Sequence, residues 1–232
     1  MDNKRITLTT TKLKREKKIK RIVKIVLLLI LLILAILYSV IGIVYNNNNF
    51  TITLDKNLYY EKGLIIYDDP DYKVFRSELY ALSPDTFDNI SYRWLPENIH
   101  DSRGGSHNGN NYLAYTFYVE NMGKDTADYY SEIVIEDVIK NVDDAVRIRV
   151  YKNDVITTYA KKSARNEPEK ETVPFLEEEL IALDHVENFR PGDIDKYTIV
   201  MWIEGSDPEC TDNILGGEIK IMMKFNSEYV DD

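Results

Sequence analysis

The distribution of apolar residues divides the chain into two parts. Ile25–Val44 is an unbroken run of twenty residues without a charge. At about 1.5 Å rise per residue, a helix of this length spans roughly 30 Å, the thickness of a bilayer's hydrocarbon core. After a polar spacer, Asn46–Asn49, short runs of alternating apolar and polar residues follow one another. The pattern therefore predicts a transmembrane helix followed by a domain of β-strands.

The alternating runs predict individual strands. Apolar residues occupy every second position in 113–119, 146–150 and 219–225, and this period of two places one face in a core and the other in water. Tyr197–Ile203 is apolar on both faces, so we expect it to be a central strand. Weaker strands are expected at Phe50–Leu54, Leu64–Tyr67, Tyr72–Phe75 and Ile133–Ile139.

Turn residues separate these strands. Asn153-Asp154 is expected to join its two neighbouring strands as a hairpin. Pro191-Gly192-Asp193 and Gly216-Gly217 are turn signals before the two strands that follow them. Two polar segments, Ser102–Asn111 and Lys161–Glu171, are expected to be exposed loops.

One short helix is predicted in this domain, at Pro174–Leu183. Proline suits the first position of a helix, and Leu176, Leu180 and Leu183 would lie on one face. About eight or more short strands in roughly 185 residues indicate a sandwich. The expected fold class is all-β: a single N-terminal transmembrane helix followed by an extracytoplasmic, jelly-roll-like β-sandwich with one short helix.

Charge is distributed unevenly along the chain. Residues 1–24 hold ten basic and two acidic residues, a formal charge of +8, whereas 45–232 hold 19 basic and 37 acidic residues, a formal charge of −18. The positive-inside rule places the basic side in the cytoplasm, and an acidic domain is unsuited to nucleic acid. We therefore expect a cytoplasmic tail at 1–24, a transmembrane helix at 25–45 and an extracellular domain at 46–232, in a single-pass protein of the cell membrane.

A cleaved signal peptide is the alternative to an anchor. The apolar region of a signal peptide is usually about 7–15 residues long and is followed by small residues at the cleavage site. Here the run is longer, and Tyr45 and the asparagines 46–49 follow it. These features favour an uncleaved anchor, while cleavage stays open.

The sequence contains one cysteine, Cys210, and three histidines, His100, His107 and His185. A sortase-like site needs a thiol, a histidine and an arginine shortly after the cysteine, but Arg190 is the last arginine. The histidines do not show the HExxH or HxH spacing of zinc sites. We therefore assign no catalytic residue and no cofactor, and enzymatic activity stays open.

Acidic clusters are the remaining chemical signal. One is Asp68-Asp69-Pro70-Asp71, and another lies in the loop Glu204–Asn213. Calcium prefers oxygen ligands from such loops, although neither cluster has the EF-hand spacing. Asp207, Glu209 and Asp212 are the candidate calcium ligands. The alternative is a solvated acidic loop, which a formal charge of −18 makes common.

The last third of the chain carries a family resemblance. The segments are Asn188–Asp193, Lys196–Gly205, Gly216–Phe225 and Tyr115–Gly123. A Phe-x-Pro-Gly-Asp turn that feeds a strand resembles the camelysin/TasA-type exported proteins of Gram-positive bacteria, over residues 112–225. The resemblance implies a jelly-roll-like sandwich with a surface or matrix role, and it carries over no catalytic residue. The long basic anchor departs from that family's pattern and argues against release and fibre assembly.

These observations support more than one function. The first is a non-enzymatic extracellular interaction or assembly module that docks a partner strand or a second copy at an exposed sheet edge. The second is a membrane-tethered protein or enzyme that binds cell-wall carbohydrate or peptide, for which 17 tyrosines offer aromatic surface. The third is a component of a secretion or conjugation machine. The expected partners are the membrane, through Ile25–Val44, and a surface protein or a second copy.

Overall fold

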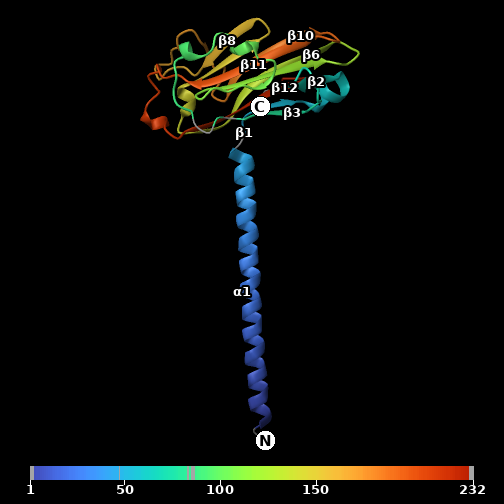
Figure 1. Ribbon diagram of the computed structural model, residues 1–232, viewed down its shortest axis with the longest axis vertical. Coiled ribbons are helices and arrows are strands. Elements are labelled where there is room, and N and C mark those ends of the chain that lie inside the picture. Colours follow the sequence, from blue (N-terminus) through green and yellow to red (C-terminus); the bar gives the residue numbers. More distant parts are fainter. Residues whose placement is uncertain (1–2, 47, 83, 85–86, 230–232) are drawn as a thin grey trace. The chain divides into compact units, whose positions relative to one another are not determined.

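The chain forms two compact units, 1–47 and 48–232, in the computed structural model shown in Figure 1. The structure describes residues 3–46, 48–82, 84 and 87–229. Strands are the main regular structure of the second unit, and the two sheets are open rather than closed into a barrel. The β-rich class and the N-terminal apolar helix predicted from the sequence are therefore confirmed.

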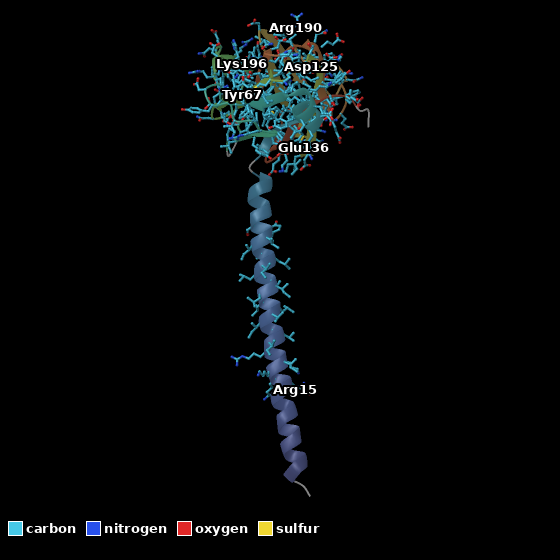
Figure 2. The ribbon with its side chains drawn as sticks, turned by 90° about the vertical axis from the view of Figure 1, so that its right-hand side faces the viewer. Arg15, Tyr67, Asp125, Glu136, Arg190 and Lys196 are labelled. Atoms are coloured by element: carbon cyan, nitrogen blue, oxygen red, sulfur yellow. The ribbon has the colours of Figure 1, made fainter. Side chains whose placement is uncertain are left out.

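The first unit is one helix, α1 (Asn3–Asn46). Within its segment Arg15–Ser39, an 18-residue window has a mean hydropathy of 3.0, and none of that window is buried in the structure. Figure 2 shows these side chains projecting from the helix on all sides, from Arg15 onward. A helix that is apolar all round needs an apolar surrounding. The segment therefore fits a single-pass membrane anchor or a signal sequence.

The second unit contains two sheets. Sheet A has the order β10-β6-β12-β1-β3 and is antiparallel except for the parallel pair of β1 and β12. Its strands are β1 (Asn48–Leu54), β3 (Glu78–Leu82), β6 (Ala127–Ile139), β10 (Leu180–Phe189) and β12 (Glu218–Asn226). The first strand after α1 thus lies beside the last strand of the domain.

Sheet B has the order β2-β5-β11-β7-β8-β9, with β4 also paired to β5. Its strands are β2 (Leu64–Tyr67), β4 (Gly105–Ser106), β5 (Leu113–Asn121), β7 (Val146–Lys152), β8 (Val155–Ala160), β9 (Val173–Pro174) and β11 (Ile194–Ile203). As predicted, β11 is a central strand with apolar residues buried on both faces. Asn153-Asp154 forms the predicted hairpin loop between β7 and β8.

Both sheets contribute to one hydrophobic core. Aromatic rings fill its centre. The ring of Phe117 from sheet B stacks on that of Tyr197, with 5.3 Å between the ring centroids, and meets Phe225 of sheet A edge-on, with 5.9 Å between the centroids. All three side chains are at most 1% exposed. Because large aromatic side chains remove much apolar surface from water, this group is the main source of cohesion between the sheets.

A second cluster covers the other face of sheet B. Ile90, Leu95 and Ile99, from the segment between β3 and β4, pack against Val200 and Trp202. This cover corrects the prediction that 113–119 and 146–150 have one face in water. The residues that the prediction placed in water include Ala114, Thr116 and Arg147, and each of these is at most 4% exposed. The covering segment is irregular, so the period of two did not reveal it.

Two predicted elements are wrong. No helix forms at Pro174–Leu183, because β9 ends at Pro174, a tight turn follows, and β10 begins at Leu180. Leu180 and Ala182 pair with β6 and Ile181 between them is fully buried in the core, so strand pairing and burial outweigh the local helix preference. Tyr72–Phe75 is not a strand: the Asp69 carboxylate accepts the backbone N–H groups of residues 71 and 72 and forms a turn there.

Helical turns occur elsewhere in the domain. They are a π-helical turn η1 (Leu58–Lys62) and the 3₁₀ turns η2 (Tyr92–Trp94), η3 (Ile99–Asp101), η4 (Val142–Asp144) and η5 (Asp212–Ile214). Each is at most five residues long, so they connect strands and do not form a layer of their own.

Candidate functional site

The structure separates the three candidate calcium ligands. Asp207 is 5% exposed, and its carboxylate lies with those of Glu209 and Glu169, each offering an oxygen within 4.8 Å of the others. Asp212 begins η5, is exposed, and is not a member of this group. Glu169 comes from the polar segment Lys161–Glu171 after β8, whose sequence predicted only an exposed loop. Its place beside Asp207 depends on how that loop folds back to form β9.

Arg147 completes this group, which we call the Arg147 cluster (Arg147, Glu169, Asp207 and Glu209). The guanidinium of Arg147 donates to the Asp207 carboxylate and lies 3.4 Å from a Glu169 oxygen. Asp207 also accepts the backbone N–H of Glu209 at 2.8 Å, and Glu209 accepts the N–H of Ala164 at 3.0 Å. The cluster therefore ties strand β7 to two loops, 161–172 and 204–217.

The carboxylates of the cluster have divergent proton affinities. Burial raises the pKa of Asp207, and its hydrogen bond to Glu209 adds to this, while Arg147 opposes both effects. Burial and the Asp207 charge also raise the pKa of Glu169. The N–H of Ala164 and the bond from Asp207 lower the pKa of Glu209. Asp207 thus takes up a proton more readily than Glu209, and the two groups can share one.

A cation would compete with Arg147 at this cluster. The oxygen donors suit calcium in their chemistry, but the guanidinium already neutralises Asp207 and approaches Glu169. The geometry thus makes the cluster an ion-paired connection between loops. Calcium binding by Asp207 and Glu209 stays a prediction, and Asp212 lies outside the described group.

The cysteine and the histidines have other environments. Burial, followed by the nearby Asp207, Glu204 and Asp88 carboxylates, raises the pKa of the Cys210 thiol. A thiol that stays protonated is a weak nucleophile. His100 stacks on Tyr151 and His185 on Tyr130, and both ring nitrogens of His107 lie at hydrogen-bond distance from backbone carbonyls.

A polar pocket of about 250 Å³ lies at the edge formed by β6, η4 and the start of β10. Its side chains include Glu136, Asp143, Lys161, Glu178 and Glu179. Lys161 pairs with Asp143 at 2.7 Å and with Asp144 at 2.8 Å. Figure 2 labels Glu136 in the part of the domain that contains this pocket. The carboxylates outnumber the single lysine, so the pocket favours positively charged groups over anions.

Most sheet edges carry features that prevent pairing with another chain. The edge strand β10 has exposed charged residues, Asp184 and Glu187, and two register irregularities. The edge strand β2 is fully buried and forms a bridge with Arg76. On β3, the Leu82 carbonyl accepts the side-chain amide of Asn108. Charges, irregular pairing and coverage are the usual devices that protect an edge.

Strand β8 is different. Strand β9 pairs only with Tyr159 and Ala160, so among the described strands Val155–Thr158 pairs with β7 alone, and β10 of sheet A also passes close to β8. Val155 is 65% exposed and Ile156 is 57% exposed. The four residues, Val-Ile-Thr-Thr, are uncharged and β-branched, which is the composition that favours strand pairing. This segment is the open β8 edge.

Comparisons with known proteins do not identify a family. No family model matches the chain, and no curated protein matches it. Two solved structures of a β-glucosidase from Kluyveromyces marxianus, one of them in complex with glucose, align with 73% of this chain. Their TM-scores are 0.25 and 0.24 at 12% and 11% identity, and the chain spans 16% of the length of each. Scores this low carry no argument about fold or activity.

Proposed function

We propose that this chain is a single-pass, membrane-anchored surface protein whose extracytoplasmic domain is a non-enzymatic assembly module. The apolar helix supports the anchor, and the +8 charge of residues 1–24 supports a cytoplasmic N-terminus. The core shared by sheets A and B supports a β-sandwich. The resemblance of residues 112–225 to camelysin/TasA-type proteins is consistent with export and with a jelly-roll-like connectivity.

The open β8 edge is the observation that carries the assembly function. An uncharged edge with free backbone groups is a template for strand addition. The occupant for which we argue is a second copy of the chain, held in the same membrane by its own anchor. Antiparallel pairing of two Val155–Thr158 segments about a two-fold axis places only β-branched residues opposite one another. No charge is buried in such a pair.

The test is the oligomeric state of the full-length chain in detergent and in nanodiscs. We expect dimers whose mass, measured by sedimentation equilibrium, falls to that of a monomer in the Ile156→Lys variant. A lysine would then lie opposite Thr157 of the other copy in each half of the pair, and these two added charges at the edge should weaken association by about tenfold or more. Ile194→Lys is the matched control, because Ile194 is also exposed, at 45%, but lies on β11 away from this edge.

Three outcomes separate the possibilities. Loss of the dimer in Ile156→Lys but not in Ile194→Lys supports assembly through β8. A wild-type chain that is monomeric at every concentration overturns it. A dimer that persists in Ile156→Lys also overturns it, because association must then use another surface. Thr157→Lys provides a second variant at the same edge in case the first does not fold.

A further inference from the structure

The covalent chain tethers one end of sheet A, the start of β1, to the anchor helix by a short connection. Helix α1 ends at Asn46, and β1 begins at Asn48. Two Cα–Cα steps of about 3.8 Å hold Asn48 within about 8 Å of Asn46, whatever the orientation of the domain. The uncharged run ends at Val44, and the headgroup region adds about 5–8 Å on each side of the hydrocarbon core. The start of β1 is therefore held at or just above the lipid headgroups.

The pairing register extends this end across sheet A. On one side of β1, Leu82 of β3 is the partner of Asn48. On its other side lies β12, where Ile221 is the partner of Phe50. The first residues of β12 then pair with the end of β6, Glu218 with Ile139 and the next residue with Val138. Four adjacent strands thus bring these residues to one end, over a width of about 14 Å at roughly 4.8 Å per strand.

Exposed apolar side chains gather at this end. Leu82 is 63% exposed, Ile139 is 43% exposed and Val138 is 37% exposed. Leu215, which is 65% exposed, precedes β12 by a short turn, and its carbonyl accepts the ammonium group of Lys140 at 2.5 Å. We call these four residues, Leu82, Val138, Ile139 and Leu215, the anchor-side rim. They come from distant parts of the sequence and meet only through the sheet.

The charges beside the rim are of both signs. Lys140 and Lys220 lie on the same strand ends as Asp137 and Glu218. Carboxylates predominate around them, because Glu136, Asp143, Glu178 and Glu179 line the pocket at this same end of β6. A bilayer of neutral phospholipid is therefore the surface that the rim approaches most readily, since anionic headgroups would repel these carboxylates.

We propose that the anchor-side rim contacts the interfacial region of the lipid bilayer that holds α1. The inference rests on the proposed function, in particular on an anchor that is retained. The short tether keeps the rim within reach of lipid at all times, whereas another protein would have to diffuse to it. Exposed leucine and isoleucine side chains lose contact with water when they enter this region.

The test uses the full-length chain in phosphatidylcholine vesicles, with Cys210→Ser as the background. A single cysteine at Leu82 or at Leu215 carries an environment-sensitive fluorophore, and a nitroxide on the lipid headgroup is the quencher. Met122→Cys is the matched control. Met122 is 53% exposed and directly follows β5 of sheet B, a strand that contributes no residue to the rim. We expect quenching at Leu82 and Leu215 to exceed quenching at Met122 several-fold.

A fourth label, on Leu32→Cys in α1, tests separately whether the anchor lies in the bilayer and whether the rim contacts lipid. If acyl-chain nitroxides quench Leu32 but all three domain labels are quenched equally, the rim does not contact lipid and the anchor stands. If Leu32 is not quenched, the anchor is not in the bilayer and both proposals fail. A double variant, Leu82→Ser with Leu215→Ser, carries its label at Ile139→Cys. Its quenching should no longer exceed the quenching of the Met122 label. Unchanged quenching in that variant would also contradict the contact.

Discussion

The guanidinium of Arg147 donates to the Asp207 carboxylate where both side chains are almost wholly buried, 5% and 0% exposed. Among the ion pairs of the described residues, this is the one with both partners shielded from water to that degree. Removing one partner of a buried pair leaves the other charge uncompensated. The pair therefore makes the loop 204–217 depend on strand β7.

Asp207→Ala should destabilise the domain by about 2–3 kcal/mol, because it removes the buried hydrogen-bond partner of Arg147 and leaves Glu169, at 3.4 Å, to compensate the guanidinium charge. Asp207→Asn should cost less, since the amide oxygen can still accept from Arg147. The control is Asp71→Ala, which breaks the exposed pair of Asp71 with Arg103 and should cost less than about 1 kcal/mol. Urea unfolding measures all three, and equal losses for Asp207→Ala and Asp71→Ala would contradict the assignment.

Glu204 should contribute stability that depends on pH. Its carboxylate accepts the Trp202 indole N–H at 3.0 Å and the Ser206 hydroxyl at 2.7 Å. Burial alone would raise the pKa of Glu204, but these bonds lower it below the ordinary value of 4.5. A carboxyl with a lowered folded pKa stabilises the fold above its unfolded pKa and loses this effect as the pH falls through the folded pKa.

The matched variant for this effect is Glu204→Gln. We expect it to be about 1–3 kcal/mol less stable than the wild type at neutral pH. The difference should shrink as the pH falls below 4.5, where the wild-type carboxyl takes up a proton. Unfolding monitored by tryptophan fluorescence, at neutral pH and at acidic pH, measures this difference in stability. A difference that does not change with pH would show that the hydrogen bonds do not depend on the charge.

Asn153 should be the most sensitive position of the β7–β8 hairpin. Its φ is +52°, a left-handed conformation, which asparagine tolerates better than most residues. Its side chain also donates to Asp195 at 2.8 Å and accepts the N–H of Lys196 at 2.9 Å. Asn153→Ala should therefore cost about 2–3 kcal/mol. Asn166→Ala is the control, with a φ of +62° in an exposed turn, and should cost about 1 kcal/mol.

Calcium should leave the unfolding temperature of the wild type unchanged, because Arg147 already neutralises the carboxylate of Asp207. Differential scanning calorimetry with and without calcium, and with a chelator, measures this. A rise that calcium produces and magnesium does not, and that Glu209→Gln abolishes, would instead identify a calcium site. Asp212→Asn is the control, since Asp212 lies outside the Arg147 cluster.

The sequence predicted the elements that periodicity controls. The apolar helix, the buried strand β11 and the hairpin at Asn153-Asp154 all follow from local pattern. The structure differs from the prediction where contacts between distant parts of the sequence determine the element or the burial of a residue. Leu180 was predicted to be helical but pairs with Val134 of β6. Arg147 was predicted to face water but is only 4% exposed, because other segments of the chain cover it.

The candidate site was predictable to a similar extent. Asp207 and Glu209 are neighbours in sequence, so their acidic loop was visible. Glu169 joins them only because the loop after β8 folds back, and Asp212 turns away into η5. No residue type marks the open β8 edge, since it results from β9 being only two residues long.

The parallel pairing of β1 with β12 has a consequence for biogenesis. Phe50 is made early and finds its partner Ile221 only after 171 further residues have been made, and β12 also separates β1 from β6 in the sheet. Sheet A thus stays incomplete until β12 has been translated and, on the proposed topology, translocated. A nascent chain stalled before that point would display the unpaired edge of β1 beside the membrane, where chaperones and quality-control proteases could recognise it.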